Sequence, residues 1–325
     1  MLLSDGRCSI FRGPIMRYEV RSFHDSQQHA AAIQGWQQVY DQLGSGRLSS
    51  ELFQVSGERF QVFHEVLDKR VVQHGNAPKQ RFCMAFATGK SPIIQRGKVG
   101  SNSVLLLRDG EEFLLHAPER TAFLSLSVDL ERLTRLADIE LGSARFSQFV
   151  SLPGMHVPMR LLKEIKAQVC RSFDGSIRQG EHEAPALEKD VEDTLMSVLL
   201  DIFLQSHAEE KRSELAVSAY IVKKSQELAL ADPGGPLSVL DLCEGLRVSR
   251  RTLQNSFQRV VGMRPIEFLR CIRLNAVRRK LANSTLMEST VGDVAYEMGF
   301  RHLSHFSASY YKLFGEYPSE TQRLE

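Results

Sequence analysis

Residues 237–265 read LSVLDLCEGLRVSRRTLQNSFQRVVGMRP, and residues 289–318 read STVGDVAYEMGFRHLSHFSASYYKLFGEYP. The two stretches are copies of one pattern, because Gly262 and Pro265 recur 53 positions later as Gly315 and Pro318. In each copy the apolar spacing predicts a short helix, a tight turn and a longer helix. Two such units, separated by one further helix, predict an all-helical domain in the last third of the chain.

Each copy has residue types suited to a helix-turn-helix unit. Cys243 and Ala295 are small, which lets the second helix cross close to the first. The turn position four residues later requires a left-handed backbone, which Gly299 adopts freely and Arg247 adopts at a small cost. Ser249 is placed to cap the first of the longer helices. The longer helices carry apolar faces at i, i+4 spacing, formed by Leu253, Phe257 and Val261 and by Phe306, Tyr310 and Phe314.

Polar side chains on the other face of the longer helices are candidates for DNA contact. Arg, Gln and Asn have planar groups that match guanine and adenine edges in the major groove. The predicted DNA contacts are Ser249, Arg250, Arg251, Gln254, Asn255, Arg301, His302, Ser304 and His305. The predicted phosphate contacts are Arg247, Arg259, Arg264, Arg273 and Lys312. His302 and His305 have no evident third ligand nearby, so we expect no metal site there.

Charge is distributed unevenly along the 325 residues, whose net charge is +2. Residues 1–236 carry a net charge of −2, and residues 237–325 carry +4. Within residues 245–281 there are nine Arg and one Lys against a single acid, Glu267. A folded basic surface concentrates positive potential where a polyanion such as nucleic acid can bind.

Residues 213–322 resemble the AraC-type DNA-binding domain, in which a linking helix joins two helix-turn-helix units. The stretch DVAYEMGFRHLSHFSASYYKLFGEYP, residues 293–318, carries the most specific part of the resemblance, and PIEFLRCIRLNAVRRKLA, residues 265–282, is similar to the family's connector. In this connector we expect one apolar face and one free basic face. The expected inward residues are Leu269, Ile272, Ala276 and Leu281, and the expected free residues are Arg270, Arg273, Arg278 and Arg279.

A narrower resemblance is to the ethanolamine-utilisation operon activators and related amine-responsive regulators. It rests on SVLDLCEGLRVSRRTLQNSF (238–257), CIRLNAVRR (271–279) and GWQQVYDQL (35–43). The resemblance implies a sequence-specific transcriptional activator of a catabolic operon, not an enzyme, with a small amine as effector. It also implies a homodimer that binds double-stranded promoter half-sites and contacts RNA polymerase. A corrinoid is a further candidate effector by resemblance alone, and no other cofactor is expected.

The N-terminal part has a different pattern. Residues 29–43 have helical spacing, whereas from Leu52 to Val128 short alternating runs predict strands. Asp109-Gly110 predicts a two-residue hairpin, and the alternation at 124–128 predicts a half-buried strand. The predicted fold class is α+β, with a β-rich effector domain, a helical linker and an all-α C-terminal domain. The predicted domains are residues 1–175 (mixed α/β, sandwich or barrel-like), 176–212 (linker with a candidate dimerisation helix) and 213–325 (DNA-binding).

Several strand residues are candidates for an effector pocket, although ordinary core packing explains them equally. They are Trp36, Phe82, Met84, Phe86, Phe113 and His116. An amine would need a carboxylate or an aromatic face to hold its cation. The available sources are Trp36, Glu65, Asp109, Glu111 and Glu112.

Other features limit the function classes. The five cysteines are scattered and contain no C-x-x-C, which favours a reducing cytoplasm over a disulfide framework. We expect no signal peptide and no transmembrane helix, and a cytoplasmic, nucleoid-associated location.

Two alternatives stay open, a regulator operated by a protein partner without a pocket and an alkyl-acceptor regulator using Cys83. The acidic residues Asp190, Glu192 and Asp193 are expected to be solvated, and the apolar stripe from Leu187 to Phe203 is either interdomain core or a dimer seam.

Overall fold

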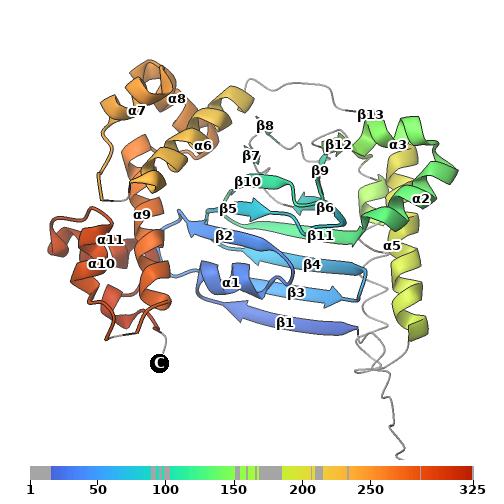
Figure 1. Cartoon of the computed structure of the whole chain (residues 1–325), viewed down its shortest axis with the longest axis horizontal. Coiled ribbons are helices and arrows are strands. Elements are labelled where there is room, and N and C mark those ends of the chain that lie inside the picture. The colour runs from blue at the N-terminus through green and yellow to red at the C-terminus, as the bar shows by residue number, and fades with distance from the viewer. Residues whose placement is uncertain are drawn as a thin grey trace, which may run out of the picture.

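A computed structural model describes residues 16–88, 93–94, 97–98, 103–150, 154–158, 160–164, 167, 185–205, 207–208, 215–232, 234–285 and 287–323. Two antiparallel sheets form the middle of the molecule (Figure 1). Helices from the middle of the chain lie against one side of this β-sandwich, and the C-terminal helices lie against the opposite side. The predicted α+β class, with a β-rich N-terminal part and a helical C-terminal part, is confirmed.

Within the described residues, the larger sheet has eight strands in the order β1-β3-β4-β11-β6-β9-β12-β13. Their bounds are β1 Arg17–Phe23, β3 Ser50–Ser56, β4 Phe60–Leu67, β11 Thr121–Asp129, β6 Arg81–Thr88, β9 Ser103–Arg108, β12 Gly154–His156 and β13 His207–Ala208. The smaller sheet has five strands in the order β2-β5-β10-β7-β8. Their bounds are β2 Gln37–Gln42, β5 Val71–Asn76, β10 Glu112–Ala117, β7 Ile93–Ile94 and β8 Gly97–Lys98.

Strand β11 was predicted to be half-buried, and this was wrong. It lies between β4 and β6 in the larger sheet, with helices packed on one face and the smaller sheet on the other, so both of its faces are covered. Leu126 packs on the helical side, whereas Ser125 and Ser127 face the space between the sheets and are buried as well. The sequence predicts that these serines face solvent, because they are small polar residues that alternate with apolar ones.

The outer face of the larger sheet is covered by helices α2 (Leu130–Glu140), α3 (Ser143–Val150) and α5 (Pro185–Gln205). The apolar stripe of α5 is buried against the larger sheet, within the core of the N-terminal part, and therefore is not the interdomain core that was one of the two predictions. The buried residues are Val191, Leu195, Val198, Leu199, Ile202 and Phe203. The prediction of a solvated acidic face fails at Glu192, which is buried and pairs with Arg132 Nη1 at 2.5 Å.

The helix predicted over residues 29–43 is wrong in its second half. Helix α1 spans Ser26–Ala32 and is capped by Asp25, whose carboxylate accepts from the N–H groups of Gln27 and Gln28. Gly35 then adopts φ 79°, and the chain continues as strand β2, paired with β5. Pairing with a sheet overrides a helical spacing in a segment this short.

The hairpin predicted at Asp109-Gly110 is also wrong, although the turn itself forms with Gly110 at φ 74°. The flanking strands do not pair with each other, because β9 belongs to the larger sheet and β10 to the smaller one. The turn is therefore the corner at which the chain passes between sheets.

The C-terminal part is helical, as predicted. Its helices are α6 (Leu215–Ala231), α7 (Val239–Leu246), α8 (Arg250–Val260), α9 (Pro265–Ala282), α10 (Val291–Glu297) and α11 (Leu303–Phe314), followed by a 3₁₀ turn at Pro318–Glu320. The predicted apolar faces of α8 and α11 are buried in one core. Leu43, Val72 and Leu114 of the N-terminal part join that core, so the two parts are packed together. No helix among the described residues is long and apolar enough to span a membrane.

Candidate nucleic-acid interface and ligand pocket

Both helix-turn-helix turns have the backbone that the sequence requires. Arg247 lies in the left-handed region at φ 54° and ψ 43°, and Gly299 has φ 79°. Ser249 caps α8, accepting a hydrogen bond from the Thr252 N–H at 3.1 Å. The side chain of His302 makes no such cap at the start of α11. The first turn therefore forms without glycine, because its strain is small compared with the packing of α7 on α8.

The nine residues predicted to contact DNA are all exposed, and they lie in or just before the N-terminal halves of α8 and α11. The predicted phosphate contacts are exposed as well, except Arg273. Arg273 is half-buried, with its guanidinium 5.3 Å from the centre of the Phe300 ring. No cluster of metal-ligating residues occurs in the part of the chain that the structure describes, His302 and His305 included.

Two connector arginines that we expected to be free are occupied. Arg278 is only 6% exposed, with its Nε 2.7 Å from Asp25 Oδ2 and its Nη2 3.0 Å from Glu316 Oε1. Arg279 forms an ion pair with Asp41. The prediction was wrong because this side of α9 faces the N-terminal part rather than solvent, which no local pattern indicates.

Asp41 is the charged centre of that interface. It is 0% exposed, and besides Arg279 it lies 3.4 Å from His74 Nε2 and 3.5 Å from Gln226 Nε2. Burial by itself would raise the pKa of Asp41, but Arg279 and His74 stabilise the carboxylate and hold its pKa below the ordinary value. Asp41 is thus a buried anion shared by elements β5, α6 and α9.

An inner cavity of about 60 Å³ lies between the two sheets. Its wall is mostly apolar and aromatic, and its main polar group is Glu65, which is 3% exposed. Tyr40 Oη donates to Glu65 Oε2 at 3.0 Å, and Gln73 Nε2 donates to Oε1 at 3.3 Å. His29 Nε2 lies 3.3 Å from the same carboxylate. Burial and the charge of Glu65 raise the pKa of Tyr40 well above its ordinary value, so the phenol keeps its proton and remains a donor.

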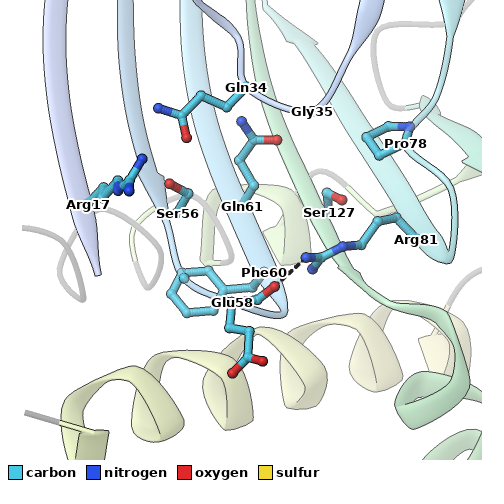
Figure 2. A pocket seen from close by; sticks show the side chains of 11 residues that line it. Arg17, Gln34, Gly35, Ser56, Glu58, Phe60, Gln61, Pro78, Arg81 and Ser127 are labelled. Carbon is cyan, nitrogen blue, oxygen red and sulfur yellow. Dashed lines mark hydrogen bonds between the residues drawn. The ribbon is translucent and has the colours of Figure 1, made fainter. Parts of the chain in front are cut away.

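An outer cavity of about 590 Å³ opens at the end of the sandwich. Figure 2 shows Arg81 extending toward the β3–β4 turn, where its Nη2 donates to the Glu58 carbonyl at 2.5 Å. The other polar residues of its wall include Arg17, Gln34, Ser56, Gln61 and Ser127. Gln61 also accepts a hydrogen bond from Trp36 Nε1 at 3.1 Å. Because Trp36 lines the inner cavity, this pair separates the two cavities.

The structure brings together only part of the predicted effector set. Trp36, Met84 and Phe113 line the inner cavity. Phe82 and Phe86 instead pack on the opposite face of the sheet, in the core with α5.

The remaining member of the set, His116, is buried toward the C-terminal part, its ring 6.4 Å from that of Phe268. Of the candidate carboxylates, Glu65 lies in the inner cavity, whereas Glu111 pairs with Arg108 and Glu112 with Lys223. The carboxylate of Asp109 accepts from the Gln80 N–H in the turn before β6.

Sequence reasoning missed Tyr40 and Gln73, which hold the Glu65 carboxylate. Residues 37–42 (QQVYDQ) contain no period-2 alternation that would mark them as a strand, so the helical spacing of the longer window determined the prediction.

Cys83 is a buried thiol in strand β6. Burial raises its pKa to about 12, so the reactive thiolate is absent at neutral pH. The same is true of Cys271, whose pKa is also raised to about 12 by burial. These environments disfavour the alkyl-acceptor alternative for both residues.

Comparison with known proteins adds independent findings. A family model described as a helix-turn-helix domain matches residues 242–324. The XylDLEGF operon transcriptional activator 2 of Pseudomonas putida is 35% identical over 88 residues, which are 27% of this chain and 56% of that protein. The chain thus spans about half the length of this relative. XylDLEGF operon transcriptional activator 1 of the same organism is 26% identical over 221 residues, 65% of this chain and 67% of that protein.

A solved structure is also similar to part of this chain. It is a probable AraC family transcriptional regulator from Rhodopseudomonas palustris, 32% identical, with coverage of 31% of this chain and 94% of that chain. The TM-score is 0.29.

Proposed function

The chain belongs to the AraC family of DNA-binding transcriptional regulators, and we propose that it activates a catabolic operon in response to a small amine. The P. putida relatives are described as operon transcriptional activators, which supports an activating role. By resemblance, it acts as a homodimer on promoter half-sites, in contact with RNA polymerase, in the cytoplasm.

Helices α8 and α11 are the proposed DNA-reading elements. Their exposed N-terminal ends carry the side chains suited to base edges, and the nearby arginines suit phosphate. Arg251 and Asn255 are the two residues to which we assign base contacts in the first unit. Ser304 is the equivalent of Arg251 in the second unit, 53 positions later, whereas Ala308 is the equivalent of Asn255. Arg301, just before α11, is the further base-contact candidate of that unit.

The buried carboxylate of Glu65 is the observation that carries the amine proposal. A carboxylate removed from water is destabilised unless a cation or several donors compensate it. Tyr40 and Gln73 donate to Glu65, His29 Nε2 lies 3.3 Å from it, and among the described residues no Lys or Arg lines the inner cavity. An ammonium group beside Glu65 would supply the counter-charge, and the ring of Trp36 would attract the same cation.

The size of the inner cavity narrows the class of effector. A volume of about 60 Å³ corresponds to roughly two water molecules at ~30 Å³ each. An amine of a few heavy atoms fits this space. A corrinoid macrocycle does not, so the cavity disfavours it as an occupant.

Calorimetric titration of the full chain tests this proposal. The probes are methylammonium, ethylammonium and ethanolamine, with ethanol and acetate as neutral and anionic counterparts. We expect saturable binding of the amines alone, and a loss of at least about tenfold in affinity for Glu65→Gln. Glu51→Gln, which changes an exposed carboxylate of β3, is the matched control and should bind like the wild type.

Two results would contradict the amine assignment. One is unchanged amine affinity in Glu65→Gln, and the other is binding of acetate in place of the amines. No binding of any probe, together with intact DNA binding, would instead support the regulator operated by a protein partner.

A further inference from the structure

The C-terminal end of recognition helix α8 is held by a residue of the N-terminal part. Arg70 Nη1 donates to the carbonyl oxygen of Val261 at 2.8 Å. The next residue, Gly262, has φ 65°, and a Cβ at this position would lie 3.3 Å from the same Arg70 nitrogen. The last carbonyls of a helix have no partner within the helix, so an external donor stabilises the end that it bonds.

Recognition helix α11 ends against the same region. Gln42 Nε2 donates to the Leu313 carbonyl at 2.7 Å, and the Gly46 N–H donates to the Lys312 carbonyl at 3.0 Å. Gly315 has φ 73°, and a Cβ there would lie 2.8 Å from the backbone nitrogen of Arg47. The repeat-related glycines 262 and 315 therefore both contact the N-terminal part.

The donors for the two helices belong to one connected unit. The N–H groups of Leu43 and Gly44 donate to the Arg70 carbonyl at 2.8 and 3.1 Å, which ties the segment after β2 to the residue before β5. Gln42, Gly46 and Arg70 are called the clasp below. Because the clasp bonds α8 and α11 at once, it limits their movement relative to each other.

The clasp leaves the DNA-reading ends free. It bonds only C-terminal carbonyls, whereas Arg250, Arg251, Arg301 and Ser304 at the N-terminal ends are exposed. This arrangement is suited to positioning the two helices rather than to covering them.

We propose that the clasp sets the spacing between the two DNA segments that α8 and α11 of one protomer read, with Arg70 and Gln42 as positioning residues. These two segments, one for each helix, are called half-sites below. The inference rests on the proposed function in one respect, that both helices read DNA. Neighbouring major grooves on one face of the duplex recur every ~10–10.5 base pairs. One added base pair shifts the second half-site by about 3.4 Å and rotates it by about 34–36°. Two helices whose relative position is fixed cannot both bind after such a change, so the affinity for DNA should fall.

The test measures how the affinity of the full chain depends on half-site spacing. Selection from random-sequence DNA with the wild-type chain supplies the operator, and derivatives carry one or two base pairs inserted or deleted between half-sites. We expect the wild type to lose at least about tenfold in affinity for one inserted base pair. Arg70→Met keeps the aliphatic stem and removes the donors, so it should reduce this loss to about threefold or less. Its affinity for an isolated half-site should stay unchanged.

Lys69→Met is the matched control. It removes the neighbouring cation, whose ion-pair partner is Asp68 and not α8, and should keep the full spacing dependence. Gly315→Ala adds a Cβ that would lie 2.8 Å from the backbone nitrogen of Arg47, so it disturbs the contact of α11 with the clasp region. It should reduce the spacing dependence as Arg70→Met does. Circular dichroism establishes that each variant is folded.

The outcomes separate this proposal from the proposed function. Unchanged spacing dependence in both Arg70→Met and Gly315→Ala overturns the clasp as a positioning device and leaves sequence-specific binding intact. Higher affinity at every spacing also overturns it, since the clasp would then obstruct DNA. A selection that recovers no preferred sequence overturns sequence-specific binding, and the positioning role with it.

Discussion

Gln42 of strand β2 and Asn275 of helix α9 exchange two hydrogen bonds. The Gln42 N–H donates to Asn275 Oδ1, and Asn275 Nδ2 donates to the Gln42 carbonyl, both at 2.9 Å. Strand β2 is an edge strand of the smaller sheet, so the carboxamide takes the place of a neighbouring strand and satisfies the open edge. The connector helix of the DNA-binding part is thereby joined to the sheet that bounds the inner cavity.

Asn275→Ala is expected to destabilise the chain by about 1–3 kcal/mol, because it leaves the buried N–H and carbonyl of Gln42 without partners. Urea denaturation at neutral pH measures the change. Asn283→Ala, at the exposed C-terminal end of the same helix, is the control and should stay within about 0.5 kcal/mol of the wild type. Equal stability of the two variants would contradict a structural role for the bonded pair.

Arg251→Ala and Asn255→Ala should each weaken binding to one half-site by about 1–3 kcal/mol, because each removes a proposed base contact. Gel-shift titrations with each half-site mutated in turn measure the effect. Arg135→Ala changes an exposed arginine of α2 and should leave affinity unchanged. Wild-type binding by both variants contradicts the assignment, and an equal loss on all sequences would mark a phosphate contact instead.

His116 makes stability depend on pH. It is 4% exposed, faces His74 of β5 and Phe268 of α9, and burial, followed by repulsion from His74, lowers its pKa to about 3. The unfolded histidine titrates near ~6.5, so the unfolded chain binds more protons below that pH. The contribution of the neutral ring is therefore present above about pH 6.5 and is lost as the pH falls toward 3. Between pH 7 and pH 5 the loss is about 2 kcal/mol.

Denaturation of His116→Leu at pH 7 and pH 5 checks this prediction, and the variant should show a correspondingly smaller loss. The pKa of Asp41 is lowered, so its own contribution is lost only at more acidic pH, below about 3.8. His156→Gln, at an exposed position of β12, should behave like the wild type. An unchanged pH dependence in His116→Leu would contradict the buried neutral ring.

The helix-turn-helix units could be predicted because local chemistry determines them. The i, i+4 spacing of apolar positions, the Ser249 cap and the left-handed turn at Arg247 each depend on residues close together in the chain. Each of these features is present in the structure. The left-handed backbone of Arg247 could be predicted although it is not a glycine, because Arg247 has the turn position that Gly299 has in the second copy.

The interface between the two parts could not be predicted, because its partners are distant in the chain. Arg279 meets Asp41 across 238 residues, and Asn275 meets Gln42 across 233. The sequence alone predicts that a basic residue on a helix is exposed to solvent, even where that residue contacts a buried carboxylate in the folded chain. Glu65 could be named as a candidate from its place in an alternating strand, but its burial beside Tyr40 depended on a strand that the sequence made look helical.

Strand β2 joins the inner cavity to the DNA-binding part through adjacent residues. Tyr40 bonds Glu65 inside the sandwich, and Asp41 bonds Arg279 on the connector helix. We therefore expect Asp41→Asn to keep amine binding and lose most of the effect of the amine on DNA affinity, because coupling requires that both ligands bias one element. Fluorescence anisotropy of labelled operator, with and without saturating ethanolamine, measures this coupling. Glu112→Gln weakens an exposed pair with Lys223 at the same interface and should keep the coupling, since such pairs contribute little. Full coupling in Asp41→Asn would show that the signal does not pass through β2 and α9.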